Sequence, residues 1–332
     1  MAQLNSLQTS GSFSIPITPR SGSSSIGYMW FNTSTKKIQY GFNGSAWSSG
    51  GNMINSRRCH AGAGDSSSST FTVGYNNLTE NYNGTSWSSS GNYPSGTKCF
   101  IAAAGTQNAG LAFGGGSGNY ATGATNEYDG SSWASGGSMG SSMCLYGTGT
   151  QNAALVFGGL YKVVGPSNPR YPYLPTPVST NYNCQTCEYN GSSWTYTTNT
   201  PTSTFSGGTA GIQDAALRIG GQPGASPVTL LYNGSTWNSQ GSLNVATCFN
   251  AATGTSNNAN TTNLNSPFAQ SYGMSENYDG TAWSVGSNLI VSRYAAAASS
   301  GGSTPLVFGG CILGSIVGSS EELASGDLIC SL

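Results

Sequence analysis

Side chains that could bind a metal ion or catalyse a reaction are scarce in this sequence. It contains one histidine, His60, so a copper or zinc centre with several histidine ligands is excluded. Cys184 and Cys187 form a redox-like pair, but on a strand a spacing of three places them on opposite faces. No second Cys-x-x-Cys or His pair completes a zinc site. We therefore interpret His60 as a polar strand residue, expect free thiols at Cys184 and Cys187, and expect neither metal nor cofactor.

A motif built around tryptophan recurs along the chain and organises it. An aromatic residue is followed by Asn or Asp, then Gly, and the tryptophan comes five positions after the aromatic residue. The tryptophans are Trp47, Trp87, Trp133, Trp194, Trp237 and Trp283, and the aromatic residues are Phe42, Tyr82, Tyr128, Tyr189, Tyr232 and Tyr278. Successive tryptophans are 40, 46, 61, 43 and 46 residues apart, so the chain is an array of repeats and these residues are expected to be structural.

The acidic residues follow the same repeat. Glu80 and Glu276 precede the motif tyrosine by two positions, Glu127 and Glu188 precede it by one, and Glu321 and Glu322 hold these positions in the last unit. A catalytic pair of carboxyl groups should be singular, with two different environments. Recurrence at a fixed position instead favours a structural role, and we predict that the protein is not an enzyme.

Each repeat predicts four short strands. The first is small and apolar, as in residues 102–105, and the second ends in a double glycine, as in Gly114-Gly115. The third carries the tyrosine and the fourth the tryptophan, joined by Asn-Gly or Asp-Gly, which favours a two-residue type I′ turn. Four strands every 40–50 residues are typical of a β-propeller blade, with small first strands around the axis and tryptophans filling the wedges between blades.

The repeat count gives seven four-stranded antiparallel blades, because residues 28–47 supply strands for one more blade. Six is the alternative, if these N-terminal strands only complete the C-terminal blade. Either arrangement brings the chain ends together and closes the ring. We expect an N-terminal arm or virion attachment segment at 1–26 and one all-β propeller domain at 27–332.

The cysteines repeat as well. Cys59, Cys99, Cys144 and Cys248 are placed at one position at the start of the first strand, where Phe205 and Tyr294 stand in other units. Equivalent residues of different blades are too far apart for a disulfide. Whether Cys311 and Cys330 meet is left open by the sequence.

Composition narrows the classes of partner. Charged residues make up 6% of the chain, against about 25% in ordinary soluble domains, and the formal net charge is −1. Without a basic field, nucleic acid is an improbable partner. We find no stretch that would span a membrane and no secretory signal, so synthesis in the cytoplasm is expected.

One insertion departs from the repeat and is a candidate recognition loop. It accounts for the 61-residue spacing and lies between the second and third strands of its blade, at residues 160–177. The residues that we expect to bind a partner are Tyr161, Lys162, Arg170, Tyr171 and Tyr173, because tyrosine and arginine are favoured at binding hot spots. The alternative is a loop that packs on its own propeller or on a sister subunit. A second irregular stretch, 257–274, should project from the same face.

The order of double glycine, tyrosine and tryptophan resembles the kelch and galactose-oxidase-like propeller family. The unit before Trp87 departs from this pattern, because Val73-Gly74-Tyr75 stands where the double glycine is expected. Ile15-Pro16 and residues 27–40 are similar to a segment common in bacteriophage virion proteins. Kelch-like chains rich in Gly, Ser, Thr and Asn also look like structural proteins of marine and cyanobacterial phages.

This resemblance implies a non-enzymatic virion structural protein, tail-associated as a fibre or adhesin, that binds a host surface glycan or receptor. The alternative is an architectural virion protein, such as a head decoration or tail adaptor, without a host ligand; a catalytic propeller is a distant third. Implied partners are other virion proteins, host surface molecules and other copies of the chain, with no nucleic acid and no membrane insertion. An adhesin should show a ligand-sized aromatic pocket on one propeller face.

Overall fold

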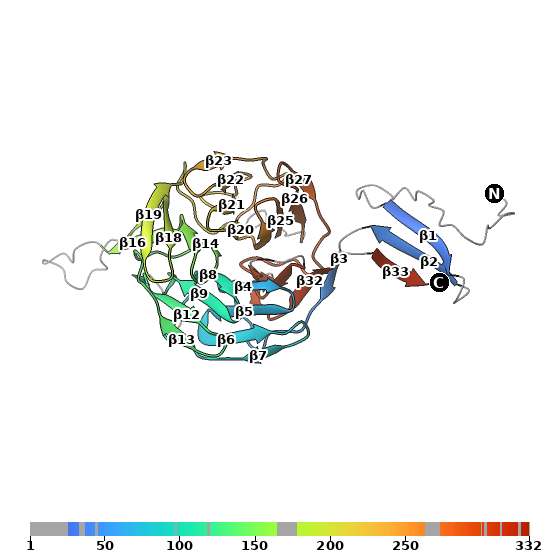
Figure 1. The fold of residues 1–332 in the computed structure, drawn as a ribbon, viewed down its shortest axis with the longest axis horizontal. Helices are drawn as coiled ribbons and strands as arrows, with labels where there is room; N and C mark the ends of the chain where they lie inside the picture. Colours follow the sequence, from blue (N-terminus) through green and yellow to red (C-terminus); the bar gives the residue numbers. More distant parts are fainter. Residues whose placement is uncertain are drawn as a thin grey trace, which may run out of the picture. The chain divides into compact units, whose positions relative to one another are not determined.

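In the computed structural model the chain is all-β, and the structure describes residues 26–32, 37–43, 46–96, 98–117, 120–164, 178–262, 273–299, 301, 304–312, 314–324 and 327–331. Six four-stranded antiparallel sheets form the blades of a β-propeller (Figure 1). Within the described residues there is no helix that is long and apolar enough to cross a membrane.

The blades follow one another along the chain. Blade 1 contains β4 (Ala61–Ser66), β5 (Ser69–Gly74), β6 (Asn76–Tyr82) and β7 (Trp87–Ser89). Blade 2 contains β8 (Ala102–Thr106), β9 (Ala109–Phe113), β12 (Thr125–Tyr128) and β13 (Trp133–Ser135). Blade 3 contains β14 (Tyr146–Gly149), β15 (Ala154–Phe157), β18 (Gln185–Tyr189) and β19 (Trp194–Asn199).

The second half of the ring repeats this order. Blade 4 contains β20 (Gly208–Ile212), β21 (Ala215–Ile219), β22 (Thr229–Tyr232) and β23 (Trp237–Ser239). Blade 5 contains β24 (Ala252–Thr255), β25 (Asn258–Thr262), β26 (Ser275–Tyr278) and β27 (Trp283–Val285). Blade 6 contains β28 (Ala297–Ala298), β29 (Leu306–Phe308), β32 (Ser320–Ala324) and, from the N-terminal side, β3 (Ala46–Ser49).

Short hairpins leave three blades between the second and third strands. They are β10 (Gly116–Ser117) with β11 (Tyr120–Ala121), β16 (Leu160–Val164) with β17 (Val178–Tyr182), and β30 (Cys311–Ile312) with β31 (Ser315–Ile316). The hairpin β16–β17 is the base of the insertion that the sequence marks.

The ring has six blades, so the preferred count of seven is wrong and the alternative holds. The strand with Trp47, β3, completes blade 6 instead of starting a blade of its own. The expected strands before it, β1 (Ile26–Asn32) and β2 (Lys37–Asn43), pair with each other and with β33 (Asp327–Ser331) in a separate sheet. The chain divides into two compact units, Met1–Ala46 with Ala324–Leu332, and Trp47–Leu323.

Small residues bring the first strands to the axis. An axial cavity of about 110 Å³ is lined by the first strands of all six blades, and Figure 1 shows β4, β8, β14 and β20 around the centre. A Cβ atom on Gly62 would lie 2.2 Å from Cζ of Phe308 in blade 6, so this position has no room for a side chain. The alanines and glycines of the first strands therefore set how closely the blades pack.

The motif tryptophans connect neighbouring blades. The Trp133 ring in blade 2 lies 6.1 Å, centroid to centroid, from Phe71 in blade 1, and its indole N–H donates to Oγ1 of Thr79 in blade 1 at 2.9 Å. The same 2.9 Å contact to the preceding blade joins Trp194 to Thr125, Trp237 to Thr186, and Trp283 to Thr229. Each tryptophan thus fills a wedge between blades and also pairs its polar atom there.

The turn between the third and fourth strands differs from the expected two-residue type I′ turn. Tyr128 pairs with Trp133, so four residues lie between the paired positions. Oδ1 of Asp129 accepts hydrogen bonds from the N–H groups of Ser131 (2.8 Å) and Ser132 (2.7 Å), and only Gly130 in this loop has a positive φ, 98°. The Asn or Asp of the motif closes the loop through its side chain, and the glycine supplies the single left-handed residue.

Candidate functional site

One face of the ring carries the irregular segments. The first strand begins where the second strand ends, as the pairing of Tyr146 with Phe157 in blade 3 shows. The three hairpins described above follow the second strands, so they leave the ring at this same end. We call this end the loop face.

A closed ring of backbone hydrogen bonds surrounds the channel at the loop face. Each bond runs from the N–H of one residue to the carbonyl oxygen of its equivalent in the preceding blade, at 2.6–3.2 Å. The six residues are Cys59, Phe100, Cys144, Ser206, Phe249 and Ala295, with φ between 51° and 57°. Left-handed backbone costs about 1–2 kcal/mol for a residue other than glycine. The hydrogen-bonded ring offsets that cost at every blade.

An aromatic pocket opens beside this ring, and we call it the axial pocket. Its volume is about 320 Å³, and four aromatic rings line it: Tyr75, Phe100, Phe249 and Tyr294. Arg58, Cys59, Cys99 and Ala295 complete the wall. The residues come from blades 1, 2, 5 and 6, so the pocket exists only when the propeller is closed. Its volume lies in the range of small-molecule sites.

Tyr75 lines the pocket in a conformation that the fold elsewhere gives to glycine. Its φ is 71°, and it stands where the double-glycine blades have their second glycine, at φ of 80–115°. Those glycines are Gly115, Gly159, Gly221 and Gly310. A tyrosine held there is strained, and such strain concentrates at ligand clamps and active sites. The departure of Val73-Gly74-Tyr75 from the repeat is the one sequence signal that leads to this pocket.

Charge in the axial pocket comes from one exposed guanidinium group. Nη1 of Arg58 lies 3.9 Å from Sγ of Cys311, and among the described residues no carboxylate forms an ion pair with Arg58. Burial raises the pKa of the Cys59 thiol to about 12 and also raises the pKa of Cys99. Both thiols are therefore protonated at neutral pH and are poor nucleophiles and metal ligands.

His60 lies just below the ring and is neutral. Its side chain is buried against Phe308, with ring centroids 5.6 Å apart, and neither ring nitrogen has a hydrogen-bond partner among the described residues. Burial, together with the nearby charge of Arg57, lowers the pKa of His60 to about 3. A neutral histidine in this place cannot supply the cation that an acid catalyst needs at neutral pH. Within the described residues no group of three or more metal-ligating side chains comes together.

The cysteine positions need a correction. The residues with positive φ mark equivalent positions in the six blades. Cys59 and Cys144 are themselves such residues, whereas Cys99 and Cys248 stand one position before them. The expected single position for all four is therefore wrong, because the strands alone do not reveal where the left-handed residue falls. Cys184, Cys187 and Cys311 have free thiols, and the side chain of Cys330 lies outside the described part of the chain.

The candidate recognition loop is described in part. Tyr161 and Lys162 lie in β16, where the backbone pairs Tyr161 with Asn181 and Lys162 with Thr180. Arg170, Tyr171 and Tyr173 lie outside the described residues. The insertion therefore stays a prediction. Sequence reasoning missed the axial pocket because its wall is assembled from residues up to 237 positions apart, Arg58 to Ala295.

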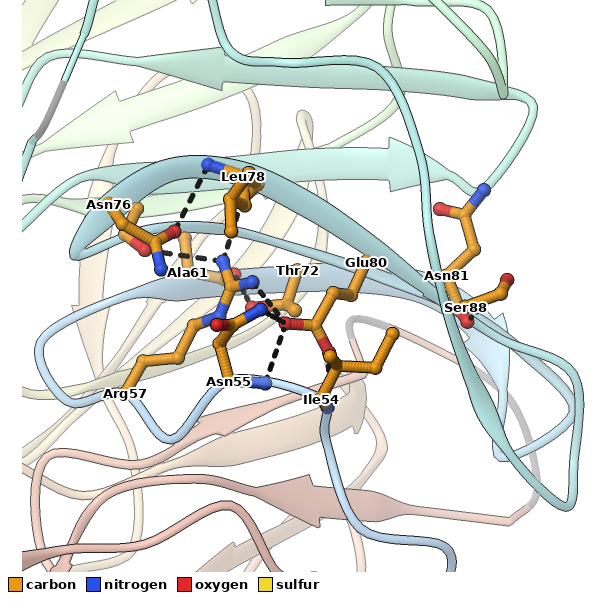
Figure 2. Close-up of polar contacts among 11 residues, drawn as sticks. Ile54, Asn55, Arg57, Ala61, Thr72, Asn76, Leu78, Glu80, Asn81 and Ser88 are labelled. Atoms are coloured by element: carbon orange, nitrogen blue, oxygen red, sulfur yellow. Dashed lines mark hydrogen bonds and ion pairs between the residues drawn. The ribbon is translucent and has the colours of Figure 1, made fainter.

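Three acidic residues of the repeat, Glu80, Glu276 and Glu321, hold the loops that lead into their blades. Glu80 in β6 is fully buried and accepts hydrogen bonds from the N–H groups of Ile54 (2.8 Å) and Asn55 (3.1 Å). Figure 2 shows the Arg57 guanidinium group between Glu80 and the carbonyl of Leu78, to which Arg57 Nη1 donates at 2.7 Å. Arg57 and Glu80 form a buried ion pair. This carboxylate is committed to structure and faces no ligand pocket.

The fold and the pocket define a six-bladed β-propeller with an aromatic cavity at one mouth of its channel. Among solved structures, the structure of YjhT is similar, with a TM-score of 0.65 and 13% sequence identity, over 81% of this chain and 95% of YjhT. At this identity the match shows the fold alone. No family model and no curated protein matches the chain.

Proposed function

We propose that this chain is a non-enzymatic recognition protein that binds its ligand in the axial pocket. The observation that carries the proposal is the ligand-sized pocket of four aromatic rings on the loop face, with the strained Tyr75 in its wall. Such a pocket is the feature that distinguishes an adhesin from an architectural propeller. The kelch-like repeat and the N-terminal segment favour a tail-associated bacteriophage virion protein that attaches to a host surface.

The chemistry of the pocket supports binding over catalysis. No carboxylate is among its described lining residues, and its two thiols are protonated. General acid–base catalysis needs two groups whose pKa values are set apart and near the working pH. Aromatic faces instead suit the C–H faces of a sugar ring, and Arg58, which has no carboxylate partner among the described residues, suits a hydroxyl or acidic group on it. We therefore assign a host surface glycan as the ligand class.

A glycan microarray probed with the full chain tests this proposal. We expect binding to a restricted set of surface glycans, and loss of that binding when Phe249→Ala removes one ring of the pocket. Labelling of intact particles with antibodies to the loop face should show that this face is accessible. If the array shows no binding and the loop face is covered by other virion proteins, the chain is an architectural component instead.

A further inference from the structure

Blade 3 lacks the buried carboxylate that holds the entry loop in blades 1, 5 and 6. In those blades a glutamate accepts two adjacent backbone N–H groups from the loop that precedes the first strand. In blade 1 the carboxylate of Glu80 accepts from the N–H groups of Ile54 and Asn55, with N···O distances of 2.8 and 3.1 Å. In blade 5 Glu276 accepts from Asn244 and Val245 at 2.8 and 3.0 Å. In blade 6 Glu321 accepts from Ile290 and Val291 at 2.6 and 3.1 Å. In blade 3 the same position, two before the motif tyrosine, is Cys187.

The arginine of this cluster is also replaced in blade 3. The carbonyl of Arg57 accepts the N–H of Gly310 at 2.7 Å, and the carbonyl of Ser142 accepts the N–H of the equivalent Gly115 at 2.9 Å. Ser142 therefore occupies the position of Arg57. Figure 2 shows the guanidinium group and the carboxylate of blade 1. In blade 3 the smaller hydroxyl group of Ser142 and thiol of Cys187 stand in their places.

A cavity lies where blade 3 has Ser142 and Cys187 in place of arginine and glutamate, and we call it the blade-3 cavity. Its volume is about 440 Å³, and both Ser142 and Cys187 line it. Its wall also holds Gly140, Ser141, Gln185 and Asn199, with the half-exposed ring of Tyr196. None of its described lining residues is charged. Burial raises the pKa of the Cys187 thiol, so the thiol stays neutral and does not repel an anion.

The entry loop of blade 3 presents the donors that the other blades use. Met139 N–H donates to the carbonyl of Gly123 at 2.8 Å, as Met53 N–H donates to Gly318 in blade 1 at 2.7 Å. Between this anchor and the position of Arg57, blade 3 has two residues, Gly140 and Ser141, where blade 1 has three, residues 54–56. Within the described part of the chain, neither backbone N–H has a hydrogen-bond partner. These two N–H groups are therefore available to a ligand in the cavity.

We infer that the blade-3 cavity binds a small organic carboxylate, whose two oxygen atoms take the place of the missing glutamate. The repeat itself supplies the precedent, because adjacent N–H groups of this loop bind a carboxylate in three blades. A paired arginine is not required, since blade 5 has Thr247 at the position of Arg57 and keeps its glutamate. The amide groups of Gln185 and Asn199 suit hydroxyl groups on the rest of the ligand.

Other features of blade 3 converge on the same cavity. The outer strand β19 extends to Asn199 and carries Tyr196 and Asn199 to the cavity, whereas the outer strands of blades 1, 2, 4 and 5 have three residues. The register between β18 and β19 shifts between Thr186 and Cys187. Irregular register re-aims side chains next to binding sites. This inference does not depend on the axial pocket.

Binding of glucuronate and glucose to the full chain tests the assignment, because the two probes differ at a carboxylate and a hydroxymethyl group. Ligand-observed NMR should show glucuronate bound at least about tenfold more tightly than glucose, since charge-assisted hydrogen bonds are the stronger kind. Cys187→Glu supplies the missing carboxylate from the chain itself and should abolish glucuronate binding. Equal binding of the two sugars, or no binding of glucuronate, overturns the inference.

A second variant keeps the test valid if Cys187→Glu fails to fold. A Cβ on Gly140 would meet no atom within 4 Å, so Gly140→Phe should fold normally and obstruct the cavity. Val285→Phe adds the same ring at an exposed site in blade 5 and is the matched control. Glucuronate binding should be lost in the first and kept in the second. If Tyr75→Gly abolishes glucuronate binding and Gly140→Phe does not, glucuronate binds in the axial pocket and the inference is contradicted.

Discussion

The hydroxyl group of Tyr189 in blade 3 donates a hydrogen bond to Oε1 of Glu127 in blade 2 at 2.7 Å. The same contact joins Tyr232 to Glu188 at 2.8 Å and Tyr82 to Glu322 at 2.5 Å, each across a blade boundary. The glutamate just before the motif tyrosine, a position that blade 6 fills with Leu323, therefore binds the tyrosine of the following blade. This pairing accounts for the acidic residues at one position of the repeat, and the entry-loop contacts of Glu80, Glu276 and Glu321 account for those at the position before it.

Removal of a tryptophan from a wedge should destabilise the whole ring. Trp133→Ala removes the ring that packs on Phe71 and the N–H bonded to Thr79, and we expect a loss of about 3–5 kcal/mol in the free energy of unfolding. Trp133→Phe should lose less, because it keeps an aromatic ring. Denaturant unfolding measures both. Wild-type stability in the alanine variant would show that the wedge is not filled by this side chain.

The buried Arg57–Glu80 pair should respond asymmetrically to substitution. Glu80→Leu leaves a buried guanidinium group without its partner, which costs about 3–5 kcal/mol. Combining it with Arg57→Met removes the uncompensated charge, so the double variant should be more stable than the single one. Urea unfolding of the three proteins gives the comparison. A double variant that is less stable than Glu80→Leu would contradict this account.

His60 should make stability depend on pH below neutrality. Its folded-state pKa is about 3, below the value of 6.5 expected in the unfolded chain, so between these pH values the unfolded chain binds a proton that the folded chain does not. Stability from this group is complete above pH 6.5 and falls as pH drops, by at most about 1.4 kcal/mol per pH unit. His60→Asn, the residue that blade 5 has in Asn250, should flatten this dependence in thermal unfolding measured from pH 7 to 4. Identical pH profiles would contradict the assignment.

Much of the fold follows from local patterns in the sequence. The spacing from Tyr128 to Trp133, the small first strands and the double glycines predict four-stranded blades, because hairpins depend on neighbouring residues. The blade count does not follow in the same way. Residues 26–43 have the same strand pattern as a blade, and only the distant pairing of β2 with β33 removes them from the ring.

The candidate sites are harder to predict because they depend on what the repeat lacks. Tyr75 is visible in the sequence as a departure from the double glycine and Cys187 as part of a Cys-x-x-Cys pair, but the pockets that they line depend on how each differs from the residue at its position in other blades. Recognition of that difference requires the blades to be aligned by their left-handed residues and hydrogen bonds. The insertion around Tyr171 is conspicuous for its length, and its role stays a prediction.

Tyr75→Gly is the measurement that tests the central claim most directly, because it separates binding from stability. Glycine is the residue that four other blades have at this left-handed position, so the variant should fold normally, with a free energy of unfolding equal to the wild-type value or higher by up to about 1 kcal/mol. Removal of the ring from the axial pocket should at the same time abolish glycan binding on the array. If the variant loses stability by several kcal/mol, or binds the same glycans as the wild type, Tyr75 is a structural residue and the axial pocket is not the recognition site.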